Sequence, residues 1–168
     1  NYNLELRTEE ITNGQNAQYN YNLSDADKLK IKVTYKIAIK NQSSTIGAIT
    51  EIVDYYDTNY KFVESYVGDE NGNKTGEVTK YDNSMYAGTE YKSTKNAYNT
   101  IYLRPNSETK LGNAEEQYIY IVLELSGPSG DVSKLLANKL LNDNSTLNTM
   151  NLAEINGYKT YNDDKRTE

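Results

Sequence analysis

The amino-acid sequence predicts a mainly β fold, an antiparallel β-sandwich with one short helix, from three observations. Apolar and polar residues alternate over residues 28–40 and again over residues 117–126. Stretches rich in Asn, Gly and Ser separate these segments, and no regular succession of strands and long helices is visible. About seven to nine strands joined by turns are typical of a sandwich. We therefore expect residues 1–168 to form a single domain, which is an ordinary domain size.

The strongest pattern runs from Lys28 to Lys40. One set of alternate positions holds five lysines, Thr34 and Ala38. The other set is apolar: Leu29, Ile31, Val33, Tyr35, Ile37 and Ile39. Strand side chains alternate between two faces, whereas a helix would scatter the lysines around its circumference. The pattern predicts a strand with one buried face and one lysine-rich face in solvent.

The remaining elements of the first half follow from weaker patterns. Residues 2–11 alternate in part and predict a first strand, and residues 19–23 predict a short strand or extended arm. Residues 46–53 predict one more strand, which ends in a turn-like segment at 54–57, and residues 60–65 predict a further short strand. Residues 68–74 predict a hairpin turn, because Asn71-Gly72 supplies the positive φ that a tight turn requires.

The second half contains one irregular region, three strands and a helix. Residues 81–99 hold four tyrosines with little periodicity, and residues 100–104 predict a short strand. The second strong strand is 117–126, which Gly127-Pro128-Ser129-Gly130 ends. Four leucines at helical spacing behind Asp131 predict a short helix at 132–142 that closes one end of the sandwich. A last strand is predicted at 150–161, interrupted by Gly157.

The amino-acid composition limits the catalytic and metal-binding chemistry that the chain can perform. The chain has no Cys, His or Trp but 17 Tyr, so the usual general base near neutral pH, the thiolate nucleophile and the common zinc ligands are missing. A net charge of −6 disfavours nucleic acid as a partner, since phosphate binding needs a positive surface. Residues encoded by AT-rich codons and the lack of Cys suggest a surface protein of a low-GC bacterium. The missing initial Met suggests a fragment of a longer protein.

The segment Asp69-x-Asn71-x-Asn73 has the oxygen spacing that opens a calcium-binding loop. The twelfth position of such a loop is normally Glu, and here it is Lys80. A plain hairpin turn is the favoured interpretation, with a calcium site as the alternative. We expect no other metal or cofactor.

Tyrosines suggest a second kind of site. Tyr55, Tyr56, Tyr86 and Tyr91 would offer flat apolar faces to a carbohydrate or a peptide if they were exposed. Half-buried tyrosines that stand in for the scarce Phe and Trp are the plainer interpretation.

Three carboxylates suggest a third kind of site. Glu51, Asp54 and Asp57 could supply the acid pair of a glycosidase, which in retaining enzymes are about 5–5.5 Å apart. Alternation places Glu51 and Asp57 on the same side of the predicted strand, but no pattern indicates a cleft around them. We therefore expect a protein that is not an enzyme.

Three segments together resemble the immunoglobulin-like domains of Gram-positive surface proteins and fimbrial subunits. Residues 33–41, VTYKIAIKN, are similar to that family's VTYxIxVxN strand. Residues 52–54, IVD, are similar to its VxDxLP strand, and residues 151–155, NLAEI, to its closing NxAxV strand. The resemblance implies an immunoglobulin-like sandwich that acts as a structural or adhesive module outside the cell, without direct membrane contact.

Some members of that group cross-link themselves through a Lys–Asn isopeptide bond beside a buried acid. The resemblance places the acid at Asp54 and the acceptor amide at Asn151. The family's lysine lies in the first strand, where this chain has Leu4-Glu5-Leu6-Arg7. Arginine keeps its charge and cannot attack the amide, so a sandwich without the bond is expected. We expect the partners to be other domains or copies of the same protein, or a host glycan or protein. Copies of the protein could join by exchange of a strand from residues 2–23.

Overall fold

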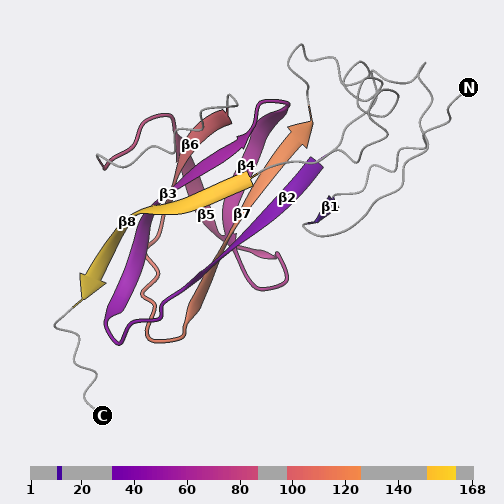
Figure 1. Cartoon of the computed structure of the whole chain (residues 1–168). Helices are drawn as coiled ribbons and strands as arrows, with labels where there is room; N and C mark the ends of the chain where they lie inside the picture. Colours follow the sequence, from indigo (N-terminus) through magenta and orange to yellow (C-terminus); the bar gives the residue numbers. More distant parts are fainter. Residues whose placement is uncertain (1–10, 13–31, 87–97, 126–150, 162–168) are drawn as a thin grey trace, which may run out of the picture.

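A computed structural model describes residues 11–12, 32–86, 98–125 and 151–161 (Figure 1). This part of the chain contains strands and no helix, so the prediction of a mainly β fold is confirmed. The strands are β1 (Ile11–Thr12), β2 (Lys32–Lys40), β3 (Ile46–Asp57), β4 (Tyr60–Gly68), β5 (Lys74–Tyr81), β6 (Tyr98–Pro105), β7 (Glu116–Leu125) and β8 (Asn151–Tyr161). No helix within these ranges is long and apolar enough to cross a membrane.

The strands form one sheet in the order β1-β2-β7-β4-β5-β6-β3-β8. All neighbours are antiparallel except the short β1, which runs parallel to β2. The sheet curls because β5 changes partner along its length: Gly76 and Glu77 pair with β4, and the residues from Val78 to Tyr81 pair with β6. The result is a half-barrel whose concave side encloses the core (Figure 1).

The core consists of the inward-facing residues of five strands. Ile119, Ile121, Leu123 and Leu125 of β7 lie at its centre, with at most 2% of each exposed. Aliphatic and tyrosine side chains from β2, β3, β4 and β6 pack against them. Burial of this many large apolar side chains, each worth about 1.5–3 kcal/mol when fully buried, is the main source of stability.

The two alternating segments fold as predicted. In β2, Val33 and Ile39 are buried, Tyr35 and Ile37 pack on the core, and Lys36 and Lys40 are exposed. The other strand boundaries differ by a few residues, with one larger error. Residues 54–57 continue β3 instead of forming a turn, and Asp54, Tyr55 and Tyr56 are buried although they alternate between the two faces of the sheet.

Several predicted elements, and one candidate residue, lie outside the described residues. They are the helix at 132–142, the short strand at 19–23, Tyr91, and all of the predicted first strand except Ile11.

Candidate functional site

Asp54 and Asn151, the two residues that the family resemblance selects, lie together. Asp54 is on the concave face of β3, on the same side as Ile52 and Tyr56 of the core, and is fully buried. Asn151 is the first residue of the neighbouring strand β8. Its Nδ2 atom donates a hydrogen bond to Oδ2 of Asp54 over 2.8 Å. The pair therefore fastens the start of β8 to the C-terminal part of β3.

The protonation of Asp54 is shifted by its surroundings. Burial raises the pKa of its carboxyl group from 3.8 to about 7, against the lowering effect of the Asn151 hydrogen bond. Oδ1 of Asp54 and Oδ1 of Asn151 are both buried without a hydrogen-bond partner. One proton on Oδ1 of Asp54 would supply a donor where two acceptors now lack one. Burial also raises the pKa of Tyr35 on β2 to about 12, and the charges of Asp54 and Asp57 add to this effect.

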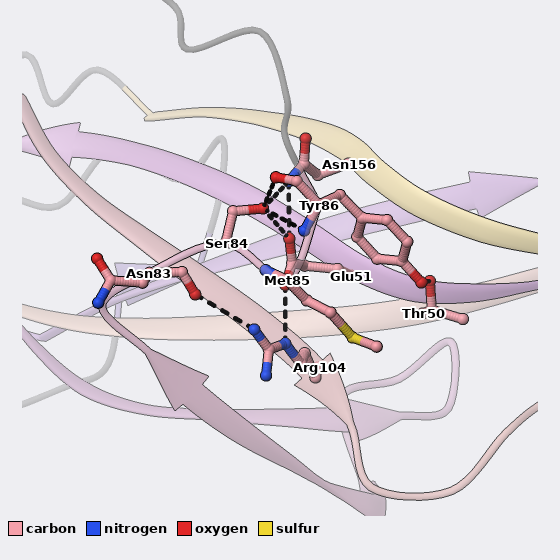
Figure 2. Close-up of polar contacts among 8 residues, drawn as sticks. All are labelled: Thr50, Glu51, Asn83, Ser84, Met85, Tyr86, Arg104 and Asn156. Atoms are coloured by element: carbon pink, nitrogen blue, oxygen red, sulfur yellow. Dashed lines mark hydrogen bonds and ion pairs between the residues drawn. The ribbon is translucent and has the colours of Figure 1, made fainter.

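A second polar cluster, which the sequence analysis did not predict, lies on the convex face around Glu51 (Figure 2). Oε2 accepts hydrogen bonds from Nε of Arg104 at 2.7 Å and from the backbone N–H of Met85 at 3.0 Å. Oε1 accepts from the Ser84 hydroxyl at 2.6 Å and from Nδ2 of Asn156 at 2.7 Å. Burial alone would raise the pKa of Glu51, but these four hydrogen bonds together lower it.

The hydrogen bonds of the Glu51 cluster attach residues 82–86 to strands β3, β6 and β8. Arg104 also stacks on the ring of Tyr81, 3.8 Å from its centre, and its Nη2 donates to the backbone carbonyl of Asn83 at 3.2 Å. The ring of Tyr86 lies on Gly157, where an added Cβ would be 2.1 Å from a ring carbon. The sequence signal for this contact was Gly157 itself, since Gly inside a strand often marks a close approach.

The three carboxylates considered for a glycosidase do not form an acid pair. Glu51 shares the convex face with Val53 and Tyr55, while Asp54 points to the concave face. Glu51 and Asp57 are on the same side, as predicted, but six residues of strand separate them by about 20 Å. Asp57 accepts a hydrogen bond from the backbone N–H of Asn59 in the following turn.

The prediction that Tyr55 and Tyr56 face a ligand is wrong. Only 3% of Tyr55 and 6% of Tyr56 is exposed, because the strand that carries them is covered on both faces. Tyr56 packs in the main core, and Tyr55 packs with Val53 and Tyr102 in a smaller cluster. Tyr86 is half-buried and its hydroxyl hydrogen-bonds to that of Thr50.

The Asp69 loop is organised as the turn of the β4–β5 hairpin. Oδ1 of Asp69 accepts from the backbone N–H groups of Asn71 and Asn73, and Oδ2 accepts from Nδ2 of Asn73. Gly72 has a φ of 89°, which explains the choice of glycine there. Both carboxylate oxygens thus already serve the loop. Within the described residues no three acidic side chains come together as a metal site.

Comparison of the chain with protein-family models, with curated proteins and with solved structures finds no match.

Proposed function

We propose that the chain is an immunoglobulin-like β-sandwich module with a structural or adhesive role in a Gram-positive cell-surface protein or pilus-like filament, and that it is not an enzyme. The observation that carries the proposal is the hydrogen bond between the fully buried Asp54 and the partly buried Asn151. The family resemblance selects these two residues, 97 positions apart in the sequence, by motif alone. Their contact supports a shared architecture more strongly than strand alternation does.

The direction of the terminal strands suits a module that transmits tension. The described fold begins with β1 and β2 at one end of the molecule, and β8 leaves it at the other end (Figure 1). A pull on the two ends acts along β2 and β8, each hydrogen-bonded over most of its length to a neighbour, β7 or β3. Many ladder hydrogen bonds then share the load. The Asp54–Asn151 pair adds a buried contact at the start of β8.

The proposed pair is non-covalent. An isopeptide bond would require a lysine amine to attack Cγ of Asn151, forming a C–N bond and releasing the side-chain nitrogen as ammonia. The attacking amine must be neutral, which needs burial. None of the lysines in the described ranges is buried.

Single-molecule pulling on tandem copies of the chain tests the mechanical role. Asp54→Ala and Asn151→Ala should lower the unfolding force, because each leaves a buried polar group unpaired. Lys61→Ala is the matched control, since it removes an exposed ion pair with Glu124 between β4 and β7. If all three variants unfold at the force of the unmodified chain, the pair carries no load.

Location is tested separately. Antibodies raised against the domain should label intact cells of the source bacterium, and mild protease treatment of those cells should release the labelled material. Labelling that appears only after lysis would overturn the proposed role at the surface.

A further inference from the structure

The sequence contains three Asn-Gly pairs, and the structure describes two of them in opposite surroundings. Asn71-Gly72 lies in the turn of the β4–β5 hairpin, and Asn156-Gly157 lies within β8. The third pair, Asn13-Gly14, lies outside the described residues. In such a pair the backbone nitrogen of the glycine can attack Cγ of the asparagine, because glycine has no side chain to hinder the approach and adopts a wide range of torsion angles.

The reaction needs only the chain and water. A C–N bond forms between the glycine nitrogen and Cγ, and the side-chain nitrogen leaves as ammonia together with the proton that the glycine nitrogen loses. Water then opens the five-membered imide ring at one of its two carbonyl groups. The product is aspartate, or isoaspartate, in which the main chain runs through Cβ and Cγ. Either product carries one more negative charge than asparagine.

Asn71 is open to this attack. Its side chain is exposed, and its amide has no hydrogen-bond partner among the described residues. The attacking N–H, that of Gly72, donates a 3.2 Å bond to the carbonyl of Asp69, which is the long limit for an N–H···O bond. Gly72 has a φ of 89°, which favours glycine. The hairpin therefore requires the same glycine that makes Asn71 reactive.

Asn156 belongs to the same kind of pair but is held by the Glu51 cluster (Figure 2). Its Nδ2 donates to Oε1 of Glu51 and to Oγ of Ser84, each at 2.7 Å. Gly157 is buried, pairs with Glu51 in the ladder between β8 and β3, and lies under the ring of Tyr86. Bringing Cγ onto the Gly157 nitrogen would break both side-chain hydrogen bonds and open the ladder locally.

We propose that Asn71 is a site of spontaneous deamidation and that the Glu51 cluster protects Asn156 from the same reaction. The two dipeptides are identical in sequence, so the fold alone separates their reactivity. The reaction is independent of the structural role proposed above, because it uses only atoms of this chain and water.

Conversion at Asn71 changes the attachment of the hairpin to the sheet. The carbonyl of Asp69 accepts a hydrogen bond from the Tyr120 hydroxyl at 2.6 Å, and the carbonyl of Glu70 accepts one from Nζ of Lys36 at 2.7 Å. Isoaspartate adds one carbon to the main chain directly after these carbonyls, so the turn and these two bonds cannot all keep their geometry. Isoaspartate at this position therefore loosens the hairpin from β7 and β2.

Peptide mapping of the full-length chain tests both sites after incubation in mildly alkaline buffer, which favours removal of the glycine proton. Trypsin cuts after Lys and Arg, so the three pairs fall in separate peptides, residues 8–28, 62–74 and 140–159. Replacement of NH2 by OH raises the peptide mass. In the folded chain Asn71 should convert at least about tenfold faster than Asn156, equivalent to about 1.4 kcal/mol, and in urea the two rates should converge. Equal rates in the folded chain would overturn the proposal.

Internal controls and substitutions separate the two halves of the proposal. Asn73 is in the same peptide as Asn71 but is not followed by glycine, so fragment ions should place the mass gain at Asn71. A gain at Asn73 instead would overturn the assignment. Tyr86→Ala and Ser84→Ala should each speed conversion of Asn156 and leave the rate at Asn71 unchanged. An unchanged rate at Asn156 in both variants would show that the cluster does not protect it.

A stability measurement tests the effect on the hairpin. Asn71→Asp carries the added charge on an ordinary backbone and is the reference. Chain that contains isoaspartate at this position, separated from the incubated sample by ion exchange, should have a lower urea midpoint than Asn71→Asp. Equal midpoints would show that the lengthened turn does not loosen the hairpin.

Discussion

At the scale of single residues, burial shifts the pKa of the Asp54 carboxyl group. Its carboxyl group has a pKa of about 7 in the folded chain, against 3.8 for an unperturbed aspartate. The folded state therefore holds the proton more tightly than the unfolded state. This contribution to stability is complete below pH 4 and is lost as the pH rises from about 4 to about 7.

Asp54→Asn should remove this pH dependence. The amide keeps the shape of the side chain and can still pair with Asn151, but it does not titrate. In urea denaturation, the unmodified chain should lose about 2–3 kcal/mol more stability than the variant between pH 5 and pH 8, since one pKa unit corresponds to about 1.4 kcal/mol. Groups elsewhere, including Glu51, contribute equally to both proteins. Parallel stability curves would show that Asp54 is ionised in the fold.

Gly157 is the second residue with a specific requirement. A Cβ at this position would overlap the ring of Tyr86, so Gly157→Ala should displace the ring and break its 2.8 Å hydrogen bond to Thr50. We expect a loss of about 1–3 kcal/mol, as for other overpacking substitutions. The measurement is a double-mutant cycle in urea. In the Tyr86→Ala background the same substitution should cost almost nothing, and an equal cost in both backgrounds would contradict the contact.

At the scale of elements, the strands whose sequence alternates were predictable and the end of β3 was not. β2 alternates because one side faces the core and the other carries exposed lysines. β7 was found from its alternating isoleucines and leucines, although Tyr120 and Val122 on its other face are buried as well. In β3, Val53 and Asp54 are both buried although they point to opposite faces. Its end resembled a turn because Asp and Tyr there lack alternation. A register shift around Glu51 further hid which side chains share a face.

The candidate site was predictable only in part, because sequence patterns are local and the site joins distant segments. Motifs selected Asp54 and Asn151 without any knowledge of distance. The Glu51 cluster joins residues from four separate segments, Ser84 and Met85 among them, and these residues carry no local signature. Only tertiary folding places Arg104 and Asn156 beside Glu51, so spacing along the chain could not identify the cluster.

The β4–β5 hairpin gives a prediction at the element scale. Asp69→Ala removes the acceptor of three loop hydrogen bonds and should lower the urea midpoint, while Asp69→Asn, which keeps one oxygen acceptor, should lower it less. Calcium and EDTA should give the same thermal midpoint for the unmodified chain. A midpoint that rises with calcium, as ligand binding to the folded state requires, would restore the cation site.

At the scale of the whole molecule, one curled sheet joins a closed core to an open edge. The β7 residues at the centre are fully buried, whereas burial decreases toward β8, where Ile155 and Tyr158 are more than half exposed. The Asp54–Asn151 pair joins β3 to the start of β8 next to this more exposed side. Among the described residues β8 has a neighbouring strand on one side only, so the pair adds a side-chain contact to the strand that has the fewest strand neighbours.

The final prediction decides whether that attachment is covalent. Intact-mass spectrometry should give the mass of the unmodified sequence, because Arg7 lies in the segment where the family resemblance would require a lysine, and no lysine of the described strands is buried. Asn151→Ala serves as the control, since its mass must equal its sequence mass in either case. A deficit of one ammonia in the unmodified chain alone would show that a lysine had displaced the Asn151 nitrogen. β8 would then be tied by a bond that urea cannot break, and the stability lost at high pH through Asp54 would no longer release it.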